Sequence, residues 1–230
     1  MADPRPWPSI LVPSAEDWSL RGGTRSGGQT FEGNEQTVAS PTARWKASLT
    51  IPCPTRETTL AMRRVIALGR TQTWNVGPLE TTRAPWNIDL VGGKIIYGRA
   101  AKRPDIYIGD QAATLDFRTS DAASMNSVLL GIQRNRGGVL EPGMIFSIEG
   151  RLHVLVDLRD GELAAPGVEG PSGAIGVFIR PWLRADYGAG TMIEFGRPLS
   201  TMRLATDDTG AMELQLSRYG TVTLDLVEAF

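Results

Sequence analysis

The sequence contains very few of the residue types on which covalent and metal-dependent chemistry usually depend. Its 230 residues include one cysteine, Cys53, and one histidine, His153. A disulfide framework and a cysteine-rich zinc site are therefore excluded. A histidine-based metal site would need carboxylates for all of its other ligands. We therefore expect no metal-binding residues and no cofactor.

The sequence also lacks a strong net charge and a long apolar run. Its formal net charge is −1, whereas a surface that binds nucleic acid is normally clearly basic. No apolar run approaches the roughly 20 residues of a membrane span, and residues 1–14 lack the basic and then apolar pattern of a signal peptide. We expect synthesis in a cytoplasm, no membrane partner and no sequence-specific nucleic-acid partner.

Lysine is scarce as well. Of the 24 basic residues, only Lys46, Lys94 and Lys102 are lysines, and the others are arginines. Arginine suits planar, bidentate contacts and is enriched at protein interfaces. A GC-rich genome would produce the same bias, so both explanations stay open.

Glycine and proline are abundant, with 26 and 15 residues, and they separate short segments of alternating polarity. Residues 198–230 show this alternation most clearly, with turns at Asp207–Gly210 and Arg218–Gly220. A period of two places the apolar side chains on one face of each strand. We predict a three-stranded meander whose apolar face is covered by earlier parts of the chain. Its apolar residues are Met202, Leu204, Met212, Leu214, Leu216, Val222, Leu224 and Leu226.

Residues 36–80 predict the partner of this meander. Residues 36–51 alternate, with Trp45, Ala47 and Leu49 on one face. Thr55 is a suitable N-cap for a helix at 55–68, and Gly69 is a natural residue after its end. Residues 36–80 together with 198–230 are therefore predicted to form a discontinuous antiparallel β-sandwich domain with one α-helix.

The segments on either side of residues 36–80 carry less pattern. Residues 1–35 are rich in proline and glycine and predict an extended N-terminal arm, in which Trp7 and Trp18 are candidate interface anchors. Residues 81–125 predict an irregular connecting region with a hairpin around Gly92–Gly93 and a short strand at Tyr107–Ile108.

Residues 126–197 predict an inserted small β-barrel-like domain of five short strands. Two of its strands, residues 144–148 and 151–158, are joined by the two-residue turn Glu149–Gly150. We predict that His153 lies on the polar face and is solvated. The fold class is therefore mainly β, with this domain inserted into the sandwich. The predicted inward residues of the hairpin are Phe146, Ile148, Leu152, Val154 and Val156.

No catalytic pattern stands out. There is no Gly-x-Ser-x-Gly elbow to supply a nucleophile for His153. Asp157, Asp160 and Glu162 lie in an acidic loop that we expect to be solvated, although they could also hold a calcium ion. A glycosidase needs only two carboxylates, and no pair is marked out. We predict no catalytic residues and no enzymatic activity.

Several segments resemble a known class of structural proteins. The segments QTVASPTARWKASLTIP and GRTQTWNVGPLE, and then LEPGMIFSIEGRLHVLV and the run from Ile179 to Phe230, resemble the distal tail (baseplate ring) proteins of long-tailed, siphovirus-like bacteriophages and prophages. The resemblance covers residues 36–80 and 139–230. Its motifs are strand and turn patterns rather than catalytic signatures.

This resemblance implies a structural role in the virion tail tip. The implied assembly is a homo-oligomeric ring, hexameric in the resembled class, that contacts the tail tube protein and the hub protein. A tail fibre is a further candidate partner. Two other functions stay open. A carbohydrate-binding β-module on the same particle would expose Trp182 and Tyr187, and a glycan hydrolase would depend on two carboxylates.

Overall fold

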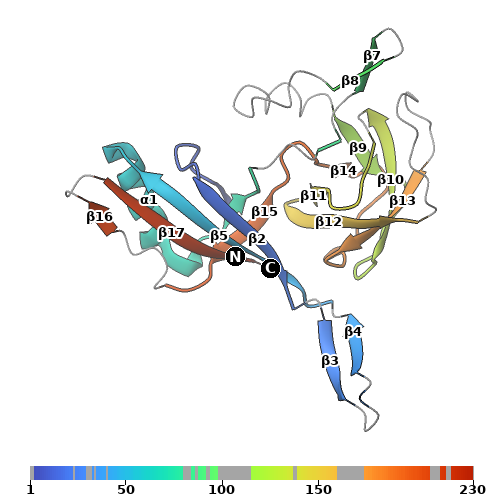
Figure 1. Ribbon diagram of the computed structural model, residues 1–230, viewed down its shortest axis with the longest axis horizontal. Coiled ribbons are helices and arrows are strands. Elements are labelled where there is room, and N and C mark those ends of the chain that lie inside the picture. The colour runs from blue at the N-terminus through green and yellow to red at the C-terminus, as the bar shows by residue number, and fades with distance from the viewer. Residues whose placement is uncertain are drawn as a thin grey trace. The chain divides into compact units, whose positions relative to one another are not determined.

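The computed structural model describes most of the chain (Figure 1). Two compact units are present: unit 1 comprises Met1–Val76 with Ser200–Phe230, and unit 2 comprises Gly77–Leu199. Both consist mainly of β-strands, which confirms the predicted fold class. The described residues are 3–22, 24–29, 33, 35–39, 41–79, 84–85, 88–91, 94–97, 115–136, 139–159, 174–207, 213–215 and 219–229.

Unit 1 is built on a seven-stranded sheet in the order β1-β6-β15-β17-β5-β2, with β16 also paired to β17. Strand β17 is central, because it pairs antiparallel with β5 on one side and with β15 on the other. Segments from both ends of the sequence are therefore joined in one sheet. Its strands are β1 (Arg5–Pro6), β2 (Ala15–Arg21), β5 (Arg44–Cys53), β6 (Trp74–Val76), β15 (Ser200–Leu204), β16 (Glu213–Gln215) and β17 (Tyr219–Glu228).

The predicted order of the C-terminal meander is wrong. Strands β15 and β16 both pair with β17, at its end and at its start, instead of lying in sequence order. The alternation is confirmed for β15 and β17, whose apolar side chains are buried. Because β17 is hydrogen-bonded to β5, the C-terminal segment extends the earlier sheet and does not pack on its face. The side chains of Met212, Leu214 and Leu216 lie outside the described residues.

The helix α1 (Arg56–Leu68) begins and ends where the sequence predicts. Thr55 is its N-cap, and its hydroxyl accepts from the Thr58 N–H at 3.2 Å while the Thr58 hydroxyl accepts from the Thr55 N–H at 3.1 Å. Gly69 follows with φ 57°, a conformation that favours glycine, and opens the short 3₁₀ turn η1 (Gly69–Thr71). The helix packs beside β5 (Figure 1) and buries Met62 and Val65.

The segment predicted to be an arm contributes two strands to the sheet. Strand β1 pairs parallel with β6, and β2 pairs antiparallel with β5 over seven residues. Between them, Leu11 is buried. The prediction underestimated this segment because proline and glycine hid a short alternating strand. Both β1 and β2 are edge strands, where proline is tolerated because an outward N–H needs no partner in the sheet.

Two hairpins form separate two-stranded sheets. Strand β3 (Thr24–Gln29) pairs with β4 (Glu35–Ala39), and within the described residues neither pairs with a third strand. Strand β7 (Ile88–Val91) pairs with β8 (Lys94–Tyr97), which confirms the predicted hairpin. Its turn at Gly92–Gly93 and the predicted strand at Tyr107–Ile108 lie outside the described residues.

Unit 2 contains a six-stranded antiparallel sheet in the order β11-β12-β13-β10-β9-β14. Two backbone hydrogen bonds between Ser147 and Glu194, at 2.9 and 2.8 Å, link the two ends of this sheet and nearly close it into a barrel. The first strand, β9, comes from the region predicted to be an irregular connection. The strands are β9 (Asp116–Thr119), β10 (Leu129–Arg136), β11 (Ile145–Ile148), β12 (Arg151–Leu158), β13 (Ala174–Arg180) and β14 (Met192–Ile193).

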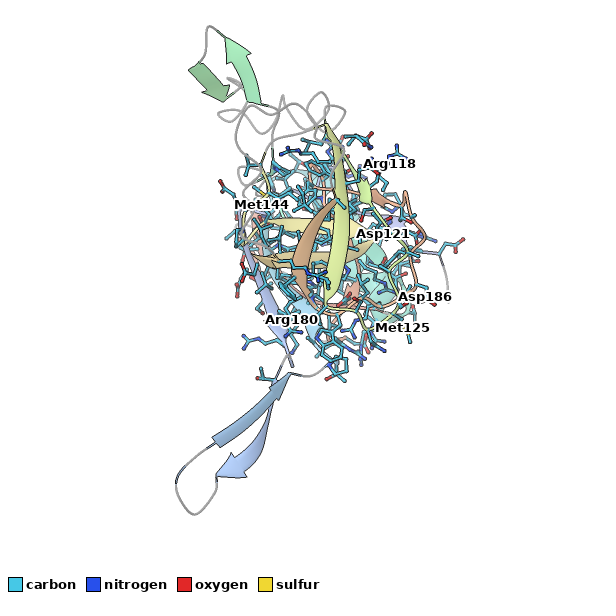
Figure 2. The ribbon with its side chains drawn as sticks, turned by 90° about the vertical axis from the view of Figure 1, so that its right-hand side faces the viewer. Arg118, Asp121, Met125, Met144, Arg180 and Asp186 are labelled. Carbon is cyan, nitrogen blue, oxygen red and sulfur yellow. The ribbon has the colours of Figure 1, made fainter. Side chains whose placement is uncertain are left out.

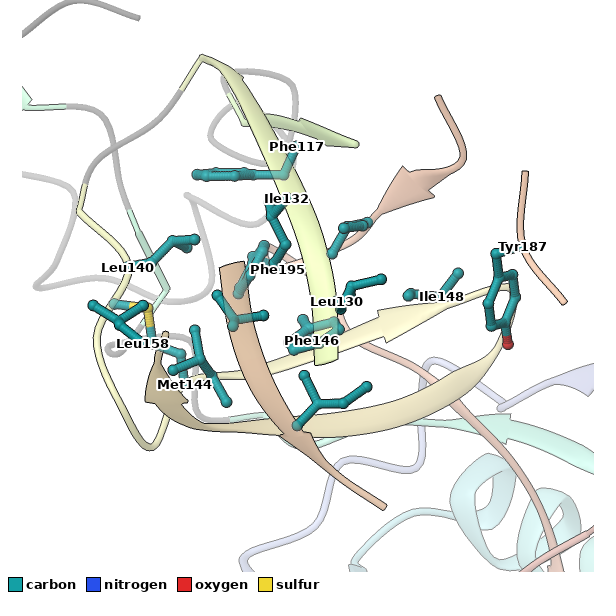
Figure 3. Close-up of a cluster of buried hydrophobic side chains, with 14 of the residues drawn as sticks. Phe117, Leu130, Ile132, Leu140, Met144, Phe146, Ile148, Leu158, Tyr187 and Phe195 are labelled. Atoms are coloured by element: carbon teal, nitrogen blue, oxygen red, sulfur yellow. The ribbon is translucent and has the colours of Figure 1, made fainter. Parts of the chain in front are cut away.

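The barrel is filled by aromatic and aliphatic side chains (Figure 3). The rings of Phe117 and Phe195 lie 4.9 Å apart between centroids, and those of Phe146 and Phe195 lie 5.1 Å apart. All three are almost completely buried. Burial of each such side chain contributes about 1.5–3 kcal/mol relative to exposure, so these rings hold the strands of unit 2 together.

Candidate functional site

The histidine of unit 2 lies beside the residues that end β13. Arg180 is followed by Pro181 through a cis peptide bond and then by Trp182. The Nδ1 atom of His153 lies 3.0 Å from the Pro181 carbonyl oxygen. The His153 ring also stacks on Phe146, with the ring centroids 5.6 Å apart. Arg180 lies at the same end of unit 2 as Met125 and Asp186, whose carboxylate accepts from the Met125 N–H (Figure 2).

The prediction that His153 is solvated is wrong, because the side chain is completely buried. A carbonyl oxygen can only accept a hydrogen bond, so Nδ1 carries the proton and Nε2 is an acceptor. Nε2 is buried and has no hydrogen-bond partner in the described part of the chain. Burial lowers the pKa of His153 to about 4. The hydrogen bond to Pro181 opposes this change, and the positive charges of Arg184 and Arg151 add to it. The ring is therefore neutral at pH 7.

The register of the β11–β12 hairpin explains this error. The turn at Glu149–Gly150 is confirmed, and it places Ile148 opposite Arg151 and Phe146 opposite His153. Directly opposed residues share a face of a sheet, and a shift by one residue exchanges the two faces. The predicted inward residues Phe146 and Ile148 are correct for β11. In β12, the predicted Leu152 is also buried, but His153 and Leu155 are buried as well, Val154 is only half-buried and Val156 is exposed.

The surroundings of His153 suit packing rather than proton transfer. Among the described residues, no carboxylate or hydroxyl hydrogen-bonds to the ring. The structure groups no three potential metal ligands within the same residues. Asp160 and Glu162 of the acidic loop lie outside them, and the Asp157 carboxylate accepts from the Leu158 N–H at 2.8 Å.

Tyr187 and Trp182 differ in their placement. Tyr187 is 3% exposed, belongs to the core of unit 2 and pairs with Ala123 through backbone hydrogen bonds. The expectation that it is exposed for binding is therefore wrong. Trp182 is half-buried, and the Arg180 guanidinium lies 5.9 Å from its ring. The two aromatic residues that sequence reasoning grouped together thus have different roles.

Trp7 and Trp18 both lie against unit 1. The Trp7 ring contacts Trp74 edge to face at 5.9 Å, and its Nε1 donates to the Leu11 carbonyl at 2.9 Å. The Trp18 ring contacts Trp45 edge to face at 6.5 Å. Each half-buried tryptophan therefore packs against the strand next to its own edge strand and stabilises that edge of the sheet.

Replacement of Trp7 tests this role. We expect Trp7→Ala to lower the melting temperature of unit 1 by about 4–8 °C, because a half-buried ring and one hydrogen bond contribute roughly 1–2 kcal/mol. Thermal unfolding followed by circular dichroism measures the change. An unchanged melting temperature would contradict this role and would favour the alternative that Trp7 is an intermolecular anchor, as the sequence first indicated.

Sequence reasoning missed the outer edge of β2. Its residues alternate between Glu16, Trp18 and Leu20 on one face and Asp17, Ser19 and Arg21 on the other. Strand β2 ends the sheet order, so within the described residues its outer edge pairs with no strand. The hairpin β3–β4 follows directly along the chain. The signal was the short alternation in Ala15–Arg21, which the neighbouring prolines and glycines concealed.

Two comparisons with known proteins were without a match. No protein-family model and no curated protein matches the chain. Among the described helices, none has the length and apolar character needed to cross a membrane.

Proposed function

We propose that the chain is a structural subunit of the tail tip of a long-tailed bacteriophage or prophage, of the distal tail (baseplate ring) type. In this role, copies made in the host cytoplasm form a homo-oligomeric ring in the virion. The ring joins the tail tube protein to the hub and to receptor-binding parts such as a tail fibre.

The observation that carries this proposal is the open sheet of unit 1. The outer edge of β2 and the two-stranded sheet β3–β4 lack a partner in the described part of the chain. A free strand edge invites pairing with another chain, and an isolated two-stranded hairpin is at best marginally stable in water. A subunit that assembles with other copies would supply the missing contacts.

The sequence resemblance adds support from other parts of the molecule. The segments that resemble distal tail proteins run through β5, α1 and β6 of unit 1, and through β11, β12 and the residues from β13 onward. They therefore take in part of the main sheet of each unit and leave out β1, β2, β9 and β10. The carbohydrate-binding alternative requires both Trp182 and Tyr187 to be exposed, and Tyr187 is buried. No observation favours a glycan hydrolase.

The size of the purified chain tests the proposal. We expect light scattering to give a mass of about six times the 24.9 kDa of one chain, and negative-stain imaging to show rings. Antibody labelling of intact particles should mark the tail tip. A chain that remains monomeric at all concentrations and is absent from purified tails would refute the proposed function.

A further inference from the structure

We propose that β2 pairs edge to edge and antiparallel with β2 of a second copy of the chain, about a twofold axis. The inference rests on the proposed function only in that the chain assembles with itself. It adds the edge, the register and the residues of one contact.

The two edges of the sheet in unit 1 are protected to different degrees. Strand β1, at one edge, is flanked and interrupted by Pro4, Pro6 and Pro8, which have no N–H to offer another strand. Proline at an edge is a common protection against pairing with another chain. Strand β2, at the other edge, has seven residues and no proline. Among the described strands, none occupies the outer edge of β2, so a further strand can pair with the sheet there.

The register with β5 shows which side chains each face of β2 presents. Trp18 lies opposite Ala47, and Leu20 lies opposite Trp45, so both belong to the apolar face. Asp17 lies opposite Ser48, and Arg21 lies opposite Arg44, on the other face. Asp17 and Arg21 are both exposed.

One antiparallel register makes this edge complementary to itself. If Asp17 of one copy lies opposite Arg21 of the other, the twofold axis creates this pair of opposite charges twice. The same register places Trp18 opposite Leu20 twice on the apolar face and Ser19 opposite Ser19 at the axis. Directly opposed residues share a face, and each of these pairs joins residues of the same face of β2. The adjacent register, centred on Trp18, would place Arg21 opposite Ala15 and leave the charges unmatched.

Among the described residues, Asp17 and Arg21 of β2 have no partner of opposite charge. Arg21 lies opposite another cation, Arg44, and like charges in directly opposed positions destabilise a sheet. In the described part of the chain, Asp17 and Arg21 make no ion pair with each other or with β5. A second β2 would give each of them a partner of opposite charge.

The segments on either side of β2 fit the same arrangement. Ile10 and Val12, just before β2, are 47% and 56% exposed. The hairpin β3–β4 follows just after it. In an antiparallel pair, the segment before β2 of one copy runs beside the segment after β2 of the other. Ile10 and Val12 of each copy would thus lie near the β3–β4 hairpin of the other, which pairs with no third strand among the described residues.

This contact differs in symmetry from the contacts that close a ring. A twofold contact uses the same surface on both copies, whereas a ring uses two different surfaces on each copy. This register pairs five residues of β2 in each copy, Asp17–Arg21. They bury less than the roughly 1,200–2,000 Å² of a stable interface, so the pair alone should be weak. We call the association of two copies of the assembly through this twofold contact, seen as a doubled mass, doubling. Loss of the twofold contact would leave the ring intact and would remove only the doubling.

A charge exchange tests the register. We would measure the mass of the full chain by sedimentation equilibrium from about 1 to 500 µM at low salt, a range chosen for a weak interface. The variants are Asp17→Arg, Arg21→Asp and the double exchange. The matched control is Asp225→Arg, because Asp225 lies opposite Ser48 from β17, in the same row as Asp17, and is also exposed.

Doubling should respond to the sign of the two charges. We expect each single variant to lower the association constant for doubling about tenfold, because it replaces two attractive charge pairs by two repulsive ones. We expect the double exchange to restore this constant. The control should double like the wild type. Equal doubling in all variants, no restoration in the double exchange, or no doubling in the wild type would each overturn the inference. In those cases a ring of the expected mass would still support the proposed function.

Discussion

A chain that ends at Leu199 is expected to lose the fold of unit 1 and to retain that of unit 2. The truncation removes β15, β16 and β17, and β17 is the strand that joins β5 to β15. Val222, Leu224 and Leu226 would no longer pack beside Ile51, Leu49 and Ala47 of β5, which lie directly opposite them on the same face of the sheet. Each of these side chains contributes about 1.5–3 kcal/mol by burial. Their combined loss is comparable with the whole stability of a domain, about 5–15 kcal/mol.

Limited proteolysis of the truncated chain measures this outcome. The strands of the six-stranded sheet of unit 2 all lie between Asp116 and Ile193, so a resistant fragment within Gly77–Leu199 should remain while residues 1–76 are degraded. The full chain under the same conditions is the control. A matched point variant is Leu224→Ala, which should destabilise unit 1 by about 2–5 kcal/mol without removing any strand. Protection of residues 1–76 in the truncated chain would contradict the central role of β17.

The sequence predicted those elements whose signals are local. The cap at Thr55, the glycine after Leu68 and the alternation of β5 each depend on neighbouring residues, and the structure confirms all three. The turn at Glu149–Gly150 is of the same kind, because Glu149 and Gly150 both have positive φ. Such features are determined by backbone geometry and hydrogen bonding within a few residues.

The features that the sequence did not predict depend on distant pairing. Strand β2 is short, and only its register with β5 identifies Trp18 and Leu20 as residues of the apolar face. The order of β15, β16 and β17 is decided by which strands meet in the sheet rather than by their spacing. For His153, the local turn was sufficient in principle, because a two-residue turn at Glu149–Gly150 places it opposite Phe146. The apolar valines of β12 obscured that inference.

The burial of His153 makes it important for stability. We expect His153→Ala to destabilise unit 2 by about 2–4 kcal/mol, because the change leaves a cavity beside Phe146 and removes the donor to the Pro181 carbonyl. Chemical denaturation measures the free energy of unfolding, and the fluorescence of Trp182, next to Pro181, is a local probe. A matched control is Val156→Ala on the same strand, where the side chain is 49% exposed and the cost should be below about 1 kcal/mol. Equal effects of the two substitutions would mean that His153 is not buried.

The same residue should make unit 2 sensitive to acid. The pKa of His153 is lowered from 6.5 to about 4 in the folded protein, so the unfolded chain binds a proton more readily than the folded chain does. Its contribution to stability is therefore complete above pH 6.5 and is lost as the pH falls towards 4, by roughly 3 kcal/mol in total. His153→Phe keeps a ring against Phe146 but cannot titrate. Because the carboxylates are common to both proteins, the difference between their unfolding free energies isolates His153. As the pH falls from 6.5 to 4, the wild type should lose more unfolding free energy than the variant does. Parallel pH profiles of the two proteins would show that the histidine is open to solvent.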